Sequence, residues 1–531
     1  MINYNLALSI YRHSLDIPGA IAVASEEKQL NYGQVAEKAS RLAETLRQSP
    51  TWQVDSKVLP RVAILGSRSI DACVAAIGAA WAGATYIPIG VKLPEEGILS
   101  ILSQCGCSAL VADEEGAQLL SARVLSACPP LVILPDAHLL PVADGSKVSL
   151  IDSESLSPSD TSQPALVRAD DTAYIIFTSG TTGVPKGVMI SAGSAHHYLT
   201  HITQKLGLSS TDRALETCEL SFDFSVHNRF ATWHAGAALY LLSATRVMNA
   251  VKFSRTEQLT VWNSVPSLAG MLHQIKALRP ESLPDLRLTV FGGEPLTKGV
   301  VEAWQIAAPN SKIVNLYGPT EATVFCLHKS VNHPTPVTPH RDFVPIGKPL
   351  AGNEAAVLDA NGDELVIGQV GELAIAGAQL AQGYVNDPEL TAARFRVLRG
   401  KRWYLTGDQA MRDDAGEFHC LGRIDNQVKV SGYRIELEAV DGHLRAITGA
   451  EVVGAIAWPI HEGMARGIVG FIGAPSVDSE VVIAELKTRL PAYMVPSRIL
   501  ALPSMPFNQS GKVDRKALRQ ILEKESASTK C

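Results

Sequence analysis

The pattern that most constrains the fold is an alternation of short apolar runs with stretches of helical periodicity. RVAILG at 61–66 is typical of a buried strand, and the apolar residues after it recur at helical spacing. The alternation continues through AYIIF at 173–177, LTVWNSV at 259–265 and KIVNL at 312–316. Strands that alternate with helices favour parallel sheets covered on both faces. The sequence therefore predicts an α/β protein with mostly parallel sheets.

The pattern changes after about residue 350. EAAVLDANGDELV at 354–366 places Asn361–Gly362 between two apolar runs, which is typical of a β-hairpin. GRIDNQVKVSGYRIELEAVD at 422–441 predicts another short β segment and then a helix. A chain of 531 residues is also too long for one compact core. We expect a large N-terminal domain at 1–424, with βα subdomains and a β-rich part, and a small α+β domain at 425–531.

Charge and cysteine usage exclude several classes of protein. The net charge of -6 offers no basic field for nucleic acid. The eight cysteines show no zinc-ligand spacing and no disulfide framework, and the N-terminus lacks the pattern of a signal peptide, so a cytoplasmic location is expected. The uncharged stretch 72–91 is rich in alanine and glycine, which favours a buried helix and strand over a membrane span.

The run FTSGTTGVPKG at 177–187 follows one of the apolar strands. Its glycines let backbone N–H groups approach a ligand closely, and its hydroxyls and lysine add donors, as phosphate-binding loops require. The spacing is neither that of a Walker A loop nor G-x-G-x-x-G. By itself the run fits a phosphate site and a plain surface turn equally well.

The same run resembles the signature [ST]-S-G-[ST]-T-G-x-P-K-G of adenylate-forming enzymes, and further motifs of that family follow in the family's order. They are WAGATYIPIG (81–90), FGGEPL (291–296), NLYGPTEAT (315–323), GELAIAGAQLAQGYVNDPELTAARF (371–395), YLTGD (404–408), GRIDNQVKVSGYRIELEAVD (422–441) and NQSGKVDRKAL (508–518). Gly90 stands where the family usually has an acidic residue. The chain resembles in particular the amino-acid adenylation domains of nonribosomal peptide synthetases and the D-alanine–carrier protein ligases.

The resemblance implies a two-step reaction. A carboxylate attacks the α-phosphate of ATP to give an acyl-adenylate and pyrophosphate, and a thiol then displaces AMP. Both steps concentrate negative charge, so positioning and electrostatic stabilisation are expected to dominate catalysis.

The resemblance also assigns residues to ATP and Mg²⁺. The phosphate loop would comprise Thr178, Ser179, Gly180, Thr181, Thr182, Gly183 and Lys186. The nucleoside would be bound by Tyr317, which stacks on adenine, by Gly292, Gly293 and Glu294 at the purine edge, and by Asp408 at the ribose hydroxyls, with Arg423 nearby. Thr320 would touch the α-phosphate, and Glu321 would hold Mg²⁺, which prefers oxygen ligands.

Two residues near the C-terminus are expected to act at different stages of the reaction. Lys512, in NQSGKVDRKAL, would bridge the substrate carboxylate and the α-phosphate. Asp425 matches the family's hinge, so the C-terminal domain would swing between the two half-reactions. Gly432 would then approach the incoming thiol.

The carboxylate substrate is expected to be an amino acid. Asp223, in CELSFDFSVHNRF at 218–230, matches the aspartate that pairs with a substrate α-amino group. The other positions of the side-chain pocket are mainly apolar; they are Phe224, His227, Asn263, Val290, Gly292, Leu316, Val324 and Phe325. A small neutral amino acid is implied, with L-proline favoured for the apolar wall and L-threonine next.

The expected acceptor is the phosphopantetheine thiol of a separate carrier protein, because the chain shows no carrier signature and no H-H-x-x-x-D-G condensation motif. Two alternatives remain open. One is an acyl- or aryl-CoA ligase on the same fold, which Asp223 disfavours. The other is an inactive homologue that binds nucleotide, which the presence of Glu321, Asp408 and Lys512 disfavours.

Overall fold

The structure is a computed structural model that describes residues 2–52, 58–135, 148–158, 163–180, 184–430, 432–461, 464–474, 476–508 and 513–528. Contacts between Cα atoms divide the chain into two compact units. The first unit comprises Met1–Val91, Ile101–Phe177 and Gly187–Gly422, and the second comprises Lys92–Ser100, Thr178–Lys186 and Arg423–Cys531.

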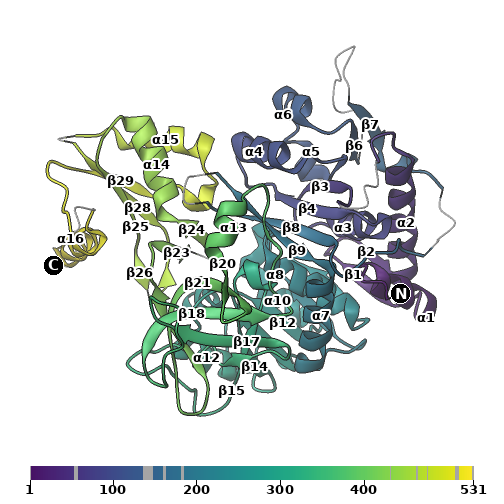
Figure 1. Ribbon diagram of the computed structural model, residues 1–531. Helices are drawn as coiled ribbons and strands as arrows, with labels where there is room; N and C mark the ends of the chain where they lie inside the picture. The colour runs from purple at the N-terminus through teal and green to yellow at the C-terminus, as the bar shows by residue number, and fades with distance from the viewer. Residues whose placement is uncertain are drawn as a thin grey trace. The chain divides into compact units, whose positions relative to one another are not determined.

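The first unit contains an eight-stranded sheet whose central strands are parallel (Figure 1). Its strands, in spatial order, are β19 (Gly383–Tyr384), β9 (Lys186–Ser191), β8 (Thr172–Thr178), β4 (Thr85–Gly90), β3 (Arg61–Gly66), β5 (Ala109–Ala112), β6 (Leu131–Leu134) and β7 (Ser149–Asp152). All six residues of β4 are buried, as expected for a strand covered on both faces.

A nine-stranded sheet forms the second layered part of the same unit. Its strands, in spatial order, are β16 (Lys348–Pro349), β15 (Leu327–Val331), β14 (Lys312–Tyr317), β13 (Leu288–Gly292), β12 (Val261–Ser264), β10 (Arg213–Glu216), β11 (Ala238–Leu241), β1 (Ile21–Ala24) and β2 (Gln29–Asn31). The pairs from β1 to β14 along this order are parallel, and only the strands at the two edges are antiparallel.

Helices connect these strands, as the alternating pattern predicts. They are α1 (Leu8–Asp16), α2 (Tyr32–Gln48), α3 (Ile70–Ala82), α4 (Glu95–Cys105), α5 (Glu114–Ala117), α6 (Ala122–Ala127), α7 (Ala192–Leu206), α8 (Asp223–Val226), α9 (Thr232–His234), α10 (Ala250–Thr256), α11 (Pro266–Gln274), α12 (Lys298–Ala307) and α13 (Pro388–Arg394). Short 3₁₀ segments are η2 (Ser153–Ser155), η4 (Ala244–Asn249) and η5 (Thr320–Ala322), and η3 (His227–Ala231) is a π-helical turn.

Helix α3 shows how the local sequence sets an element's limits. The Ser69 side chain accepts a hydrogen bond from the N–H of Ala72 and caps the start of the helix. Gly83 ends it in the left-handed conformation, with φ of 85°, which a residue with a Cβ adopts at a cost. The helix then runs into β4, so stretch 72–91 is a buried helix and strand, as predicted. Within the described residues, no helix is both long and apolar enough to cross a membrane.

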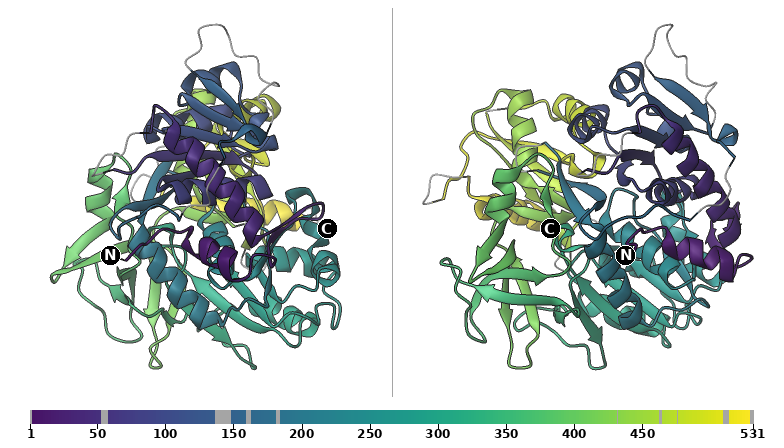
Figure 2. Two further views of the ribbon diagram at one scale, coloured as in Figure 1. Left: turned by 90° about the vertical axis from the view of Figure 1, so that its right-hand side faces the viewer. Right: turned by 45° about the vertical axis from the view of Figure 1, so that its right-hand side comes forward.

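The β-rich part of the first unit is an antiparallel sheet, drawn in green in Figure 2. It consists of β17 (Asn353–Leu358), β18 (Val370–Gly377), β21 (Lys401–Arg412) and β20 (Phe395–Leu398), and β22 (Phe418–Arg423) pairs with β21. The Asn361–Gly362 turn lies between β17 and β18, where Gly362 has φ of 87° and Leu358 bridges Glu364. The predicted hairpin is therefore confirmed.

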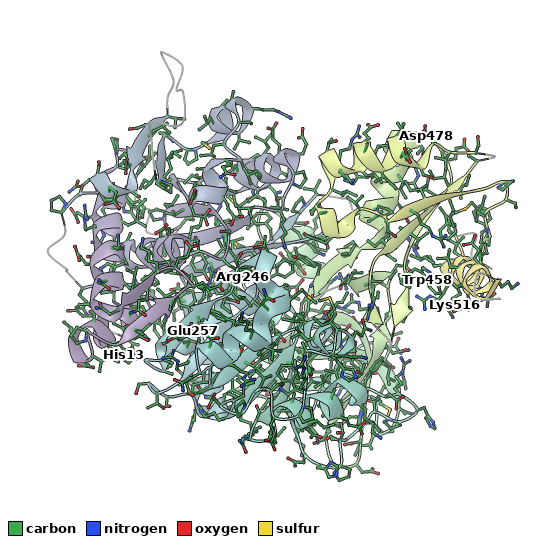
Figure 3. The ribbon with its side chains drawn as sticks, turned by 180° about the vertical axis from the view of Figure 1, so that it is seen from behind. His13, Arg246, Glu257, Trp458, Asp478 and Lys516 are labelled. Atoms are coloured by element: carbon green, nitrogen blue, oxygen red, sulfur yellow. The ribbon has the colours of Figure 1, made fainter. Side chains whose placement is uncertain are left out.

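The second unit is α+β. It has one sheet of β24 (Tyr433–Glu436), β23 (Gln427–Val430), β27 (Met464–Ala465) and β26 (Ile460–His461), and one of β25 (Val453–Ala457), β28 (Ile468–Gly473) and β29 (Arg498–Leu502). Its helices are α14 (Leu437–Thr448), α15 (Ser479–Arg489), η6 (Ala492–Met494) and α16 (Arg515–Ser528). Figure 3 labels Trp458, which packs on the cluster that includes Leu518 of α16, and Lys516 in the same helix.

Candidate active site

The predicted nucleotide and amino-acid residues of the first unit gather at the carboxyl ends of the parallel strands β12, β13 and β14. Gly292 is the last residue of β13 and Tyr317 the last of β14. In open α/β sheets this edge is where ligands bind, because the loops that follow the strands converge there. Asp223 and its neighbours belong to the segment that follows β10 of the same sheet.

Tyr317 and Asp408 are brought together from distant parts of the chain. The Tyr317 hydroxyl donates a hydrogen bond to the Asp408 carboxylate. Burial, and then the charge of Asp408, raise the pKa of Tyr317 well above its usual value, so the hydroxyl stays protonated and remains a donor. The residues expected to contact adenine and ribose are thus neighbours in the fold.

Glu321 is fully buried in the short turn η5, directly after Thr320. Its Oε1 accepts a hydrogen bond of 2.9 Å from the hydroxyl of Tyr384 in β19. Glu294 is anchored differently, since its Oε2 accepts from the N–H of Ser267 in the first turn of α11 at 2.9 Å. Anions are stabilised at that end of a helix.

The segment 319–325, here named the Glu321 loop, is held by one side chain that sequence reasoning missed. The amide nitrogen of Gln379 donates to the carbonyls of Ala322, Thr323 and Phe325 at 3.2, 3.3 and 2.8 Å. Asn353 in turn donates to the Gln379 amide oxygen at 2.5 Å, which fixes the orientation of the amide. Gln379 lies inside the quoted motif 371–395, but nothing in the motif reveals which carbonyls it contacts.

The backbone of the Glu321 loop is strained where Gln379 holds it. Thr323 and Val324 have φ of 55° and 66°, although both are β-branched. Such residues rarely adopt this region, and they do so mainly at functional sites where surrounding contacts enforce it. Glu321 and Phe325 are only four residues apart in the chain, and these two left-handed residues lie between them.

Three predicted specificity residues form an aromatic cluster, here named the side-chain site. The ring centroids of Phe224 and Phe325 are 4.9 Å apart in a T-shaped arrangement, and those of His227 and Phe325 are 5.7 Å apart. Gly292 completes it, because a Cβ at that position would lie 2.6 Å from the Phe325 ring. Only glycine permits this close approach.

Tyr198 in α7 is a further member of the side-chain site that the sequence did not reveal. Its hydroxyl lies 2.6 Å from Nδ1 of His227. Burial lowers the pKa of His227 to about 3, so the imidazole is neutral at physiological pH. His227 begins the π-helical turn η3, a feature found often at functional sites, and no sequence signal distinguishes that turn from an ordinary helix.

Three of the remaining predicted side-chain residues, Asn263, Val290 and Leu316, share one face of the nine-stranded sheet, whereas Val324 lies in the Glu321 loop. Asn263 pairs in register with Val290, and Gly292 with Leu316. Residues opposite each other in neighbouring strands, and residues two apart in one strand, point to the same face. The other face packs on α12, where Trp262 lies 4.7 Å from Trp304 by ring centroids.

Asp223 is the first residue of α8, and the N-cap is Phe222, whose side chain makes no capping hydrogen bond. Burial, and then the charge of Asp223 among other groups, raise the pKa values of Tyr174 and Tyr198 well above their usual range. In the chain, Asp223 directly precedes Phe224, whose ring belongs to the side-chain site.

The phosphate loop groups with the second unit by its contacts. Thr178 donates to the carbonyl of Lys186 at 3.5 Å, and Ser179 donates to the carbonyl of Arg434 at 2.8 Å. The Lys186 ammonium lies 3.6 Å from the carboxylate of Glu436. Gly180 follows Ser179, whereas Thr181, Thr182 and Gly183 lie outside the described residues.

Arg423 and Asp425 form a two-pronged ion pair, with Arg423 nitrogens 2.8 and 2.6 Å from the two carboxylate oxygens. The structure thus gives Arg423 an acidic partner two residues away. Lys512 lies outside the described residues, so its placement stays a prediction. Among the residues that the structure does describe, no group of three or more His, Cys, Asp or Glu side chains could hold a metal ion.

Comparison with known proteins identifies the family. A family profile described as "AMP-binding enzyme" matches residues 12–385. Tyrocidine synthase 3 of Brevibacillus parabrevis is 33% identical over 514 residues, which are 95% of this chain and 7% of that protein. The D-alanine–D-alanyl carrier protein ligase of Bacillus velezensis is 29% identical over 94% of this chain and 96% of the ligase. The chain spans less than half the length of several of its other curated relatives.

Among solved structures, the adenylation domain AlmE of Vibrio cholerae in complex with glycyl-adenosine-5'-phosphate superposes with a TM-score of 0.87. The two sequences are 30% identical, and the match covers 99% of this chain and 98% of AlmE. The family profile covers more than half of the chain, and the architecture agrees over nearly its whole length. The chain therefore belongs to the AMP-binding enzymes, the adenylate-forming ligases, and has their mixed α/β fold.

Proposed function

We propose that the protein activates a small neutral amino acid with ATP and transfers it to a carrier protein. In the first step a carboxylate oxygen of the amino acid attacks the α-phosphorus of ATP. The new O–P bond gives an aminoacyl-adenylate, and the bond to the β-phosphate oxygen breaks to release pyrophosphate. In the second step the sulfur of a phosphopantetheine arm attacks the acyl carbon, the thiol proton leaves to solvent, and AMP departs.

The observation that carries the proposal is the position of Asp223 beside the side-chain site. Asp223 directly precedes Phe224, whose ring lies 4.9 Å from that of Phe325 by centroids. A carboxylate beside an aromatic cluster suits an amino acid, since the ammonium group needs an anionic partner and the side chain an apolar surface.

Residues of the first unit fit the nucleotide. Asp408 offers acceptor oxygens to ribose hydroxyls, and its bond with Tyr317 holds the ring in place. Thr320 and the buried Glu321 lie in one turn, where Glu321 offers the hard oxygen ligand that Mg²⁺ prefers. Mg²⁺ would neutralise phosphate charge when bound, and with no cluster of acidic ligands in the described part of the chain it would retain several waters.

The second half-reaction rests on the C-terminal segment. Gly292, Gly293 and Glu294 serve the nucleotide throughout, whereas Lys512 serves adenylation alone and Asp425 acts as the hinge. Gly432 then approaches the thiol arm. The Bacillus velezensis relative is a D-alanyl carrier protein ligase by name, which supports a carrier protein as the acceptor.

ATP–pyrophosphate exchange across a panel of acids tests this function. We expect exchange with small neutral amino acids, among which L-proline and L-threonine are the candidates that the apolar walls admit. Palmitate and benzoate, as representatives of fatty and aryl acids, should give background. Exchange with these acids and with no amino acid would contradict the proposal.

A further inference from the structure

Two polar groups, one in the side-chain site and one on the sheet face beside it, have no hydrogen-bond partner among the residues that the structure describes. Asn263 is only 3% exposed, yet its side-chain amide oxygen makes no hydrogen bond within the described residues. His227 is 1% exposed and uses Nδ1 alone, so its Nε2 also has no hydrogen-bond partner in the described part of the chain. Buried polar groups are nearly always hydrogen-bonded, and an exception at a binding site points to a ligand.

The bond from Tyr198 determines which atom His227 presents. Among the described residues, Nδ1 of His227 is the sole partner of the Tyr198 hydroxyl. The hydroxyl hydrogen needs an acceptor, because Tyr198 is fully buried and remains protonated. Tyr198 therefore donates to Nδ1, and the neutral imidazole carries its own hydrogen on Nε2. His227 presents a donor, whereas the amide oxygen of Asn263 presents an acceptor.

Both groups lie over the same region of the sheet. Asn263 shares a face with Val290 and therefore with Gly292, two residues further along β13. The Phe325 ring covers that face at Gly292, and His227 lies 5.7 Å from the same ring by centroids. A ligand on this face meets one donor and one acceptor among apolar walls.

We propose that the side-chain site recognises a hydroxyl group, so that the amino acid is L-threonine or a close hydroxyl-bearing analogue rather than L-proline. The hydroxyl accepts from Nε2–H of His227 and donates to the amide oxygen of Asn263. Tyr198 is a positioning residue, which acts by fixing the tautomer of His227. This inference rests on the proposed amino-acid activation.

The chemistry of a single hydroxyl matches the pair better than any hydrocarbon does. A hydroxyl both donates and accepts, as the two unpaired groups require. The proline ring offers neither function and would leave His227 and Asn263 unsatisfied. Sites built to bind a substrate hydroxyl reject the analogue that lacks it far more strongly than hydrocarbon sites distinguish a methyl group.

Threonine and valine are the matched substrates for the test, since they differ by a hydroxyl in place of a methyl group. We expect kcat/KM in pyrophosphate exchange to favour threonine over valine and over proline by at least about 100-fold. Proline or valine equal to or better than threonine would overturn this inference and leave the proposed function intact. If no amino acid supports exchange, the proposed function itself fails.

Tyr198→Phe tests the positioning role. It should reduce the threonine-to-valine ratio of kcat/KM by at least about tenfold, mainly through threonine, because His227 then loses its fixed tautomer. Tyr32→Phe is the matched control: Tyr32 is also fully buried and donates to the carbonyl of Ala237 at 2.7 Å, so its loss should leave the ratio unchanged. An unchanged ratio in Tyr198→Phe would remove Tyr198 from this role.

Asn263→Leu provides a second variant should Tyr198→Phe fold poorly. Replacing the amide with a hydrocarbon of similar size should shift the preference toward valine by at least about tenfold. Retention of the full threonine preference would contradict the role of Asn263.

Discussion

The buried polar groups of the Glu321 loop and those of the side-chain site differ in their hydrogen bonding. In the loop, Gln379 binds three carbonyls and Tyr384 binds Glu321, so the protein satisfies its own groups. At the side-chain site, His227 lies beside the rings of Phe224 and Phe325, and within the described residues the Asn263 amide oxygen and His227 Nε2 have no hydrogen-bond partner.

This difference corresponds to two tasks of the protein. One is adenylate formation, which is common to every carboxylate substrate, and the other is the selection of one amino acid. The chemistry at the α-phosphate is the same for every carboxylate, so a rigid, internally bonded loop serves it well, because preorganised groups need no rearrangement during the reaction. Recognition of one amino acid requires hydrogen-bonding capacity that only the correct ligand satisfies. Substitutions in each region test this contrast, and the expected effects decrease from one to the next.

Asp223→Asn should have the largest effect, since it removes the proposed anionic partner of the substrate ammonium group and so impairs the selection of the amino acid. Truncating one partner of a buried charge pair typically costs about 2–5 kcal/mol, so amino-acid-dependent exchange should fall at least about 100-fold. Binding of a nonhydrolysable ATP analogue, measured by calorimetry, should be unchanged. The exposed Asp170→Asn is the control. Undiminished amino-acid exchange in Asp223→Asn would exclude the proposed role.

Gln379→Leu should impair adenylate formation with every substrate. It leaves three backbone carbonyls of the Glu321 loop without their donor, and unsatisfied buried groups cost about 1–3 kcal/mol each, so the melting temperature should fall by several degrees. Exchange should decrease about tenfold for every amino acid that is accepted, because Glu321 loses its fixed position.

Gln382→Leu is the control for Gln379→Leu. The Gln382 side chain is bonded to Thr172 and Asp170 rather than to carbonyls of the loop, so exchange should change little. Equal losses of exchange in the two variants would show that the loop does not depend on Gln379.

His227→Gln should alter the pH dependence of stability. Because burial depresses the pKa of His227 to about 3, the unfolded chain binds a proton between pH 6.5 and pH 3 that the folded protein does not. The contribution of neutral His227 to the free energy of unfolding is therefore complete above pH 6.5 and is lost as the pH falls toward 3. Between pH 7.5 and pH 5 the wild type should lose about 2 kcal/mol more stability than the variant.

Denaturant titrations at the two pH values measure this difference. His328→Gln is a positive control, since burial lowers the pKa of His328 to about 4. Identical pH dependence of the wild type and His227→Gln would mean that His227 binds a proton as readily in the folded protein as in the unfolded chain.

The sequence predicted the features that depend on local pattern. The run 61–66 is β3, the run 173–177 lies in β8, and the Asn361–Gly362 turn joins two strands. The ordered motifs also identified the family, which the profile and the AlmE structure confirm. Each of these features is encoded within a few consecutive residues.

Features that depend on long-range contacts could not be predicted. Tyr198 meets His227 across 29 residues, and Gln379 meets Phe325 across 54. The left-handed Thr323 and Val324 contradict the preference of β-branched residues, and only tertiary contacts explain them. The place of Arg423 near the ribose stays a prediction, and its ion pair with Asp425 is a contact that the sequence did not indicate.

The contacts of Gln379 have a consequence for how selectivity can diverge. The Gln379 side chain donates to carbonyls of the Glu321 loop, and its backbone carbonyl accepts from the Thr323 hydroxyl at 2.6 Å, so these contacts do not involve the side chain of residue 325. The backbone path is therefore independent of which side chain stands at position 325. Replacement of Phe325 can reshape the amino-acid preference while Glu321 keeps its place, so new substrates can be acquired in single steps without loss of adenylate formation.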